Sequence, residues 1–259
     1  MNIRPEKNVW DNTWGEQSEV VQISHADKKI FDYLINEIDP KNKNVIELGC
    51  GRGVLSYLLS KYDSKSITLM DFSNEALLRA KNIFKGSDNI NFLKGDLLNI
   101  KSDKKYDIVF SSGVVEHFSD TLRKQAIDKH FEVSDDKVIF IIPAKPHYNT
   151  IRHKKRKTIK SFGWQEAFSK DEMYDYCKHH KNFKITVSKR FYPMYGITLN
   201  ELLNIDKKNK IIFIYNSIVN ILNKILFKIK FYRFLNLVLT PFEDHIGGLL
   251  IIILEKNKE

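Results

Sequence analysis

Short apolar runs rich in β-branched residues recur along the first half of the chain, and segments of helical periodicity separate them. The runs are "NVIEL" (44–48), "SITLMD" (66–71), "NINFLKGD" (89–96), "YDIVFSS" (106–112) and "KVIFIIP" (137–143). Helices are expected between them over 54–61, 74–84 and 121–131, capped in the last two cases by Ser73 and by Ser119 or Asp120. This alternation predicts a doubly wound, Rossmann-like α/β domain with a mostly parallel sheet.

The pattern outside this region predicts the rest of the architecture. A helix is expected within 18–38, where Val21, His25, Ile30, Leu34 and Ile38 recur on one face. After Pro143 the sequence predicts a helix over 170–179, a strand over 183–193 and a last strand near 246–255. Gly247 and Gly248 indicate a bulge or a close backbone approach in that last strand. We therefore expect an N-terminal helical cap (1–43), a core (44–195 and 242–259) and a helical insertion or lid (196–241).

The pattern within the expected insertion predicts an amphipathic helix with a basic stripe. The longest piece without a charge is 211–223, which is shorter than the roughly 18 residues that a membrane span needs. A helical pair packed on the core is the simplest interpretation. Peripheral contact with an anionic membrane surface is a second one, because Lys224, Lys228 and Arg233 flank the apolar positions.

Composition is that of a folded chain with a sizeable core. The 259 residues are 42% hydrophobic, and no linker or repeat divides them. Cys50 and Cys177 are the two cysteines, and the polar N-terminus lacks the apolar segment of a signal peptide, so we expect a cytoplasmic protein. His147, His153, His179 and His180 do not show metal-ligand spacing, and no metal is expected.

Charge is distributed unevenly along the chain. Residues 1–144 carry a net charge of −2, whereas residues 145–259 carry +12. The segment 144–160, "AKPHYNTIRHKKRKTIK", is basic and contains no acidic residue. It predicts either an anionic partner or solvated surface lysines, and the sequence leaves both open.

A glycine-rich turn follows the first apolar run. Gly49, Gly51 and Gly53 in "IELGCGRG" have the spacing G-x-G-x-G, which departs from the dinucleotide fingerprint G-x-G-x-x-G and from the P-loop. Glu47 lies two residues before the first glycine, where a carboxylate would repel a pyrophosphate. The turn therefore favours a ligand that is cationic or neutral near this point.

This stretch resembles motif I of the class I S-adenosylmethionine-dependent methyltransferases. The resemblance implies a seven-stranded sheet with an antiparallel last strand, and a glycine turn beneath the methionine part of S-adenosylmethionine. It also implies that Asp71 takes the ribose hydroxyls, that Asp96 contacts the adenine amino group, and that the fourth strand's end lines the methyl-transfer pocket. The cofactor-binding residues expected in this way are Glu47, Gly49, Cys50, Gly51, Gly53, Asp71, Phe72, Gly95, Asp96, Leu97, Ser111 and Ser112.

The segment "GVVEHFSD" (113–120) resembles the G-x-x-E-H segment of small-molecule methyltransferases, including those of quinone biosynthesis. The resemblance implies that Glu116 and His117 are catalytic residues at the floor of the cofactor and acceptor pocket. His117 is a candidate general base, or the pair helps to bind a metal or to orient the acceptor. A structural role is the alternative, in which His117 packs under the cofactor and Glu116 pairs with the next helix. The fourth strand is not followed by the Asn/Asp-Pro-Pro-Tyr/Phe motif of enzymes that methylate base amino groups.

The sequence thus predicts methyl transfer from S-adenosylmethionine to a small or lipophilic molecule, with oxygen as the favoured acceptor atom. A hydrophobic or anionic acceptor fits, and nucleic acid is disfavoured. Trp10 and Trp14 are candidates for an aromatic lid. Two alternatives stay open, an RNA methyltransferase and a cofactor-binding protein without turnover.

Overall fold

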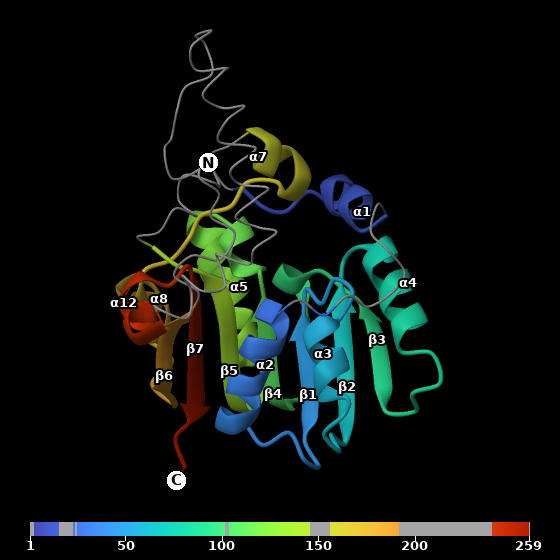
Figure 1. Cartoon of the computed structure of the whole chain (residues 1–259), viewed down its shortest axis with the longest axis horizontal. Coiled ribbons are helices and arrows are strands. Elements are labelled where there is room, and N and C mark those ends of the chain that lie inside the picture. The colour runs from blue at the N-terminus through green and yellow to red at the C-terminus, as the bar shows by residue number, and fades with distance from the viewer. Residues whose placement is uncertain are drawn as a thin grey trace, which may run out of the picture.

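The computed structural model describes residues 3–15, 23, 25–101, 104–145, 156–191 and 240–258. Its central sheet is covered by helices on both faces (Figure 1). The strands are β1 (Asn44–Leu48), β2 (Ser66–Asp71), β3 (Ile90–Lys94), β4 (Tyr106–Ser112), β5 (Ser134–Pro143), β6 (Phe183–Phe191) and β7 (Leu249–Lys256). The α-helices are α1 (Lys7–Gly15), α2 (His25–Glu37), α3 (Val54–Leu59), α4 (Asn74–Ile83), α5 (Asp120–Glu132), α7 (Arg156–Phe162), α8 (Lys170–Cys177) and α12 (Glu243–Ile246). The 3-10 helices are η1 (Leu97–Asn99), η2 (Val115–His117) and η3 (Thr240–Phe242).

The sheet has the order β3-β2-β1-β4-β5-β7-β6. Strands β1 to β5 pair in parallel, and β7 pairs antiparallel with both β5 and β6. The expected seven-stranded sheet with an antiparallel last strand is therefore confirmed. The order reverses between β1 and β4, so the carboxyl ends of these two strands form the crevice where doubly wound folds bind ligands.

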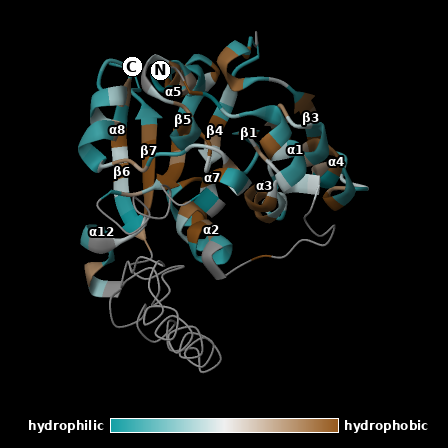
Figure 2. Ribbon diagram, turned by 90° about the horizontal axis from the view of Figure 1, so that it is seen from above, coloured by the Kyte–Doolittle hydropathy of each residue, from teal (hydrophilic) through white to brown (hydrophobic). Residues whose placement is uncertain are grey.

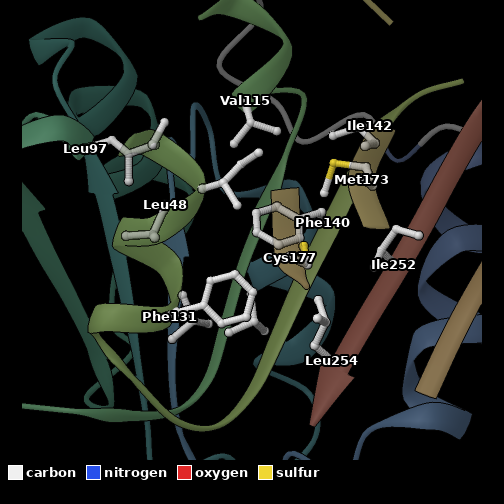
Figure 3. Close-up of a cluster of buried hydrophobic side chains, with 14 of the residues drawn as sticks. Leu48, Leu97, Val115, Phe131, Phe140, Ile142, Met173, Cys177, Ile252 and Leu254 are labelled. Atoms are coloured by element: carbon white, nitrogen blue, oxygen red, sulfur yellow. The ribbon is translucent and has the colours of Figure 1, made fainter. Parts of the chain in front are cut away.

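Each face of the sheet has its own hydrophobic core. Helices α2, α3 and α4 cover one face and bury Ile30, Leu34 and Leu55 against it. The other face packs against α5, α8 and η1, and Figure 3 shows its cluster, in which Phe140 and Ile252 of the sheet meet Met173 and Cys177 of α8. In Figure 2, β7 is mostly brown and α8 largely teal, as expected for a buried strand beneath a surface helix.

Most expected elements occur within a few residues of their predicted ends. Ser73 caps α4 by accepting a hydrogen bond from the Ala76 amide, as predicted. Ser119 precedes α5 but makes no side-chain cap, because its hydroxyl accepts from the Ile3 amide at 2.7 Å. The shift of register in the β6 and β7 pairing lies between Ile185 and Val187.

Gly247 confirms the predicted close backbone approach. A Cβ there would meet the Glu243 carbonyl and the Phe191 backbone at 2.6 Å, so no larger residue fits between α12 and β6.

Some predictions fall outside the described residues. These are the insertion over 196–241 except for its last two residues, the middle of the basic segment (146–155), and Val21. In the part of the chain that the structure describes, no helix is both long and apolar enough to cross a membrane.

Candidate functional site

The glycine turn after β1 requires glycine for both backbone and space. Gly49, Gly51 and Gly53 have φ angles of 68°, 53° and 70°, which side-chain-bearing residues rarely adopt. A Cβ on Gly49 would lie 2.6 Å from Val114, and one on Gly53 would lie 2.2 Å from Leu69. The turn therefore packs closely on β2 and on the segment after β4.

Asp71, at the end of β2, holds the glycine turn in place. Its Oδ2 accepts from the Gly51 amide at 2.9 Å, and its Oδ1 accepts from the Ser73 amide at 2.8 Å. Burial raises the pKa of Asp71, opposed by these backbone hydrogen bonds. Each carboxylate oxygen has a second lone pair, so Asp71 can also accept from a ligand hydroxyl.

Asp96, after β3, is held by two elements. Its Oδ1 accepts from the Leu98 amide at 3.1 Å, and its Oδ2 pairs with the Arg4 guanidinium at 2.7 Å. Arg4 belongs to the N-terminal segment, which thus reaches across the carboxyl ends of the strands. Figure 1 shows this segment and α1 above the upper edge of the sheet.

Neighbouring cavities line this edge. One of about 340 Å³ is lined by Pro5, Trp10, Trp14, Gly49, Cys50, Gly51, Asp71, Phe72, Ser112, Gly113, Val114, Glu116, His117, Thr158, Phe162 and Gln165. A second, of about 560 Å³, is lined by Arg4, Pro5, Lys7, Phe72, Lys94, Gly95 and Asp96. A smaller one between them adds Leu97. The first two volumes lie in the range typical of small-molecule sites.

Glu116 and His117 lie on η2 at the wall of the 340 Å³ cavity. The Glu116 carboxyl is buried, and its Oε2 has no hydrogen-bond partner. Burial raises the pKa of Glu116 to about 8. His117 Nδ1 lies 2.9 Å from the Trp164 carbonyl; because a carbonyl only accepts, Nδ1 carries the proton and the lone pair of neutral His117 is on Nε2.

Aromatic side chains form the roof of the cavity. Trp10 and Trp14 of α1 stack with ring centroids 5.7 Å apart, and Trp10 meets the His117 ring edge-on at 5.0 Å. A Cβ on Gly51 would lie 2.6 Å from the Trp14 ring. Phe162, at the end of α7, packs against Trp10. The roof therefore combines residues of α1 and α7, which are far apart in the sequence.

Three of the expected cofactor-binding residues do not line these cavities. Glu47 is buried and accepts from the Ser56 hydroxyl at 2.5 Å, and burial raises its pKa to about 8. Gly53 begins α3. Ser111 turns to the opposite face of β4, where its hydroxyl meets His130 Nε2 at 2.9 Å. These three residues lie behind the cavity lining, whereas the other expected residues line the cavities.

Several cavity residues were not predicted from the sequence. They include Arg4, Pro5, Lys7, Lys94, Thr158, Phe162 and Gln165. Contacts such as that of the Thr13 hydroxyl with the Ser161 carbonyl join α1 to α7 across 148 residues, and no local pattern marks such a pairing.

Comparison with known proteins identifies a family. A family described as "Methyltransferase domain" matches residues 39–194. Malonyl-[acyl-carrier protein] O-methyltransferase 1 of Ilyobacter polytropus is 29% identical over 149 residues, which are 56% of this chain and 54% of that protein. The ubiquinone biosynthesis O-methyltransferase of Coxiella burnetii is 32% identical over 93 residues, 35% of this chain and 39% of that one. The chain spans about half or less of the length of these curated relatives.

Solved structures show the same fold at low identity. Magnesium protoporphyrin IX methyltransferase of Synechocystis PCC 6803, with bound SAH, has a TM-score of 0.58 and 14% identity, covering 96% of this chain and 93% of that one. The N-methyltransferase NodS of Bradyrhizobium japonicum WM9 has a TM-score of 0.60 and 11% identity, with coverages of 97% and 98%. Because the family match extends over more than half of the chain and includes β1 to β6, the chain belongs to the methyltransferase-domain family.

Proposed function

We propose that this chain transfers a methyl group from S-adenosylmethionine to a small-molecule acceptor, with oxygen as the favoured acceptor atom. One observation carries the proposal. The glycine turn and Asp71 share the wall of a single cavity with Glu116 and His117. A cofactor site and a possible proton acceptor thus open onto the same space.

The residues at the carboxyl edge suit the functional groups of S-adenosylmethionine. Asp71 offers acceptors to a ribose diol, and Asp96 offers them to the adenine amino group. The Glu116 side chain lies in the wall of the cavity, and its buried Oε2 has no hydrogen-bond partner. A buried polar atom without a partner is costly, so a hydrogen-bonding ligand that reaches this carboxyl would stabilise the site.

The curated relatives suggest two kinds of acceptor, a malonyl group on a carrier protein and a ubiquinone precursor. Among the described residues, no Lys or Arg lines the 340 Å³ cavity, whereas Trp10, Trp14 and Phe162 do. A carboxylate next to Glu116 would lack a cationic partner there. The lining therefore favours a hydroxyl-bearing acceptor with an apolar or aromatic body.

S-adenosylmethionine, when bound, supplies a methyl group that its sulfonium already activates. The chain's own contribution is to orient the acceptor, exclude water and remove the acceptor's proton. We assign proton removal to His117 Nε2, because the Trp164 carbonyl holds the other ring nitrogen. Trp10 keeps the imidazole in place by its edge contact and, with Trp14, shields the cavity.

Isothermal titration calorimetry with S-adenosylmethionine and with S-adenosylhomocysteine tests the cofactor assignment, and a screen of phenolic and carboxylate acceptors tests the rest. We expect binding of one cofactor molecule per chain and turnover with the phenolic acceptors. Absence of binding would contradict the proposal. Affinity for RNA that weakens steeply with salt would instead favour the RNA methyltransferase alternative.

A further inference from the structure

Asp128, His179 and His180 meet at a surface point away from the cofactor cavities. Asp128 lies in the middle of α5, and the two histidines lie in the turn between α8 and β6. Their ligand atoms are all within 4.8 Å of one another. The sequence does not indicate this group, because 51 residues separate Asp128 from His179.

Two of the three distances between the ligand atoms are already close to those in a metal's coordination shell. His179 Nε2 and His180 Nε2 lie 3.1 and 2.8 Å from the same oxygen, Asp128 Oδ1. In a tetrahedral zinc site, with bonds of about 2.0–2.2 Å, neighbouring ligand atoms are roughly 3.3 Å apart. A small outward shift of each side chain would therefore admit the ion.

Packing fixes one ligand and leaves an entry path at another. The His180 ring stacks on Phe131, with centroids 3.8 Å apart and planes 12° from parallel. The His179 side chain is 41% exposed. A fixed imidazole, a carboxylate on a rigid helix and an open side are what a three-ligand zinc site with one solvent position requires.

We propose that Asp128, His179 and His180 bind a divalent transition metal ion, with zinc as the best match to two imidazoles and a carboxylate. The ion would join α5 to the turn that leads into β6, the edge strand of the sheet. None of the three residues lines the cofactor cavities. The metal therefore stabilises the fold and takes no part in methyl transfer.

Lys124 occupies the proposed metal site with its own positive charge and so provides a test of the proposal. Its ammonium lies 2.6 Å from Asp128 Oδ2 and 3.0 Å from His179 Nε2, so it must move aside when a cation binds. Removing this positive charge should tighten metal binding. In a surface cluster that binds no metal, the same change would merely remove these two contacts.

The test uses the untagged full chain, Zn²⁺ alone and a chromophoric chelator as competitor. We expect one Zn²⁺ per chain, a higher melting temperature with Zn²⁺, and an affinity that Asp128→Asn and His179→Ala each lower about tenfold or more. Lys124→Ala should raise the affinity. His245→Ala, which alters an exposed histidine outside the group, should leave it unchanged.

Cofactor binding serves as the check on folding, because the variants should bind S-adenosylmethionine as the parent chain does. The proposal is overturned if no saturable binding occurs in the micromolar range. It is also overturned if Asp128→Asn and His179→Ala bind zinc as tightly as the parent chain. Zinc binding and cofactor binding can both be measured even if the chain does not transfer a methyl group.

Discussion

The Arg4 guanidinium donates to Asp96 at 2.7 Å, across 92 residues of sequence. This contact ties the N-terminal segment to the end of β3, where the proposed adenine position lies. The two side chains are 47% and 27% exposed, so the pair contributes less than about 1 kcal/mol to stability. The ion pair therefore matters for ligand access, because Arg4 occupies the Asp96 carboxylate that would accept from the adenine amino group.

The two partners of this ion pair should respond differently to substitution. Asp96→Asn removes the charged acceptor and should weaken cofactor binding by about 1.5–3 kcal/mol. Arg4→Ala frees Asp96 and should speed cofactor association several-fold, as followed by the fluorescence of Trp10 and Trp14 in stopped flow. If Arg4→Ala weakens binding as much as Asp96→Asn does, Arg4 contacts the cofactor directly.

Gly51→Ala should detach α1 from the glycine turn. The new Cβ would lie 2.6 Å from the Trp14 ring, at a φ of 53° that costs a side-chain-bearing residue about 1–2 kcal/mol. We expect weaker cofactor binding and faster proteolysis of the N-terminal segment. Calorimetry with S-adenosylmethionine and limited proteolysis measure these two effects, and urea unfolding measures the accompanying loss of stability.

Gly86→Ala is the matched control for Gly51→Ala, because Gly86 has a φ of 83° and open space around its Cβ. It reports the backbone strain alone. In a double-mutant cycle, Trp14→Ala should remove the part of the Gly51→Ala effect that exceeds this strain. Additive effects would show that the ring and the turn are not coupled.

Glu116 should make stability depend on pH. Its pKa is raised from 4.5 to about 8 by burial, so between these values the unfolded chain binds fewer protons than the folded chain. The free energy of unfolding should therefore fall as pH rises through this window, with the loss complete above about 8. Glu116→Gln should reduce the dependence of the free energy of unfolding on pH, which urea unfolding at several pH values measures. Glu47→Gln should have the same effect.

Glu132→Gln is a control for the two buried carboxyls, because Glu132 is exposed. The free energy of unfolding of this variant should depend on pH as that of the parent chain does. An unchanged pH dependence for Glu116→Gln would show that Glu116 does not gain its proton on folding.

Ser111→Ala should destabilise the fold without loss of cofactor affinity. His130 Nδ1 donates to the Ala126 carbonyl at 2.8 Å, and burial lowers the pKa of His130 to about 4. Its Nε2 is therefore an acceptor that the Ser111 hydroxyl satisfies. Leaving it unsatisfied costs about 1–3 kcal/mol, which urea unfolding can measure.

Ser112→Ala is the matched comparison, because Ser112 lines the cavity. It should have little effect on stability and a larger effect on cofactor binding. The reverse pattern for the two serines would contradict their assigned faces.

The sheet was predictable because buried parallel strands leave continuous apolar runs. The expected bounds at 44–48, 66–71 and 106–112 match β1, β2 and β4. Strand ends in such a sheet meet at one edge, so the glycine turn, Asp71 and Asp96 could be assigned to one site. Ser111 and Ser112 could have been separated too, since adjacent strand residues point to opposite faces.

Trp10 and Trp14 were recognised in the sequence as candidates for a lid, but the contacts that place them, and the proposed metal site, were not predictable. Trp14 on Gly51, Arg4 on Asp96 and Asp128 beside His179 are contacts between segments far apart in sequence. Such contacts depend on how helices dock, which local periodicity does not encode. The exposed polar pattern of α1 resembles that of any surface helix, although its tryptophans cover a cavity.

His117 gives the most direct test of the reaction itself. If His117 Nε2 removes the acceptor's proton, His117→Ala should lower turnover by about 10²–10⁴ while cofactor affinity stays near that of the parent chain. Added imidazole should restore part of the rate. A residue that only fills space beside Trp10 would instead lower stability and cofactor affinity together, and imidazole would not rescue it. Turnover near the parent value in His117→Ala would show that the acceptor loses its proton without help from this side chain.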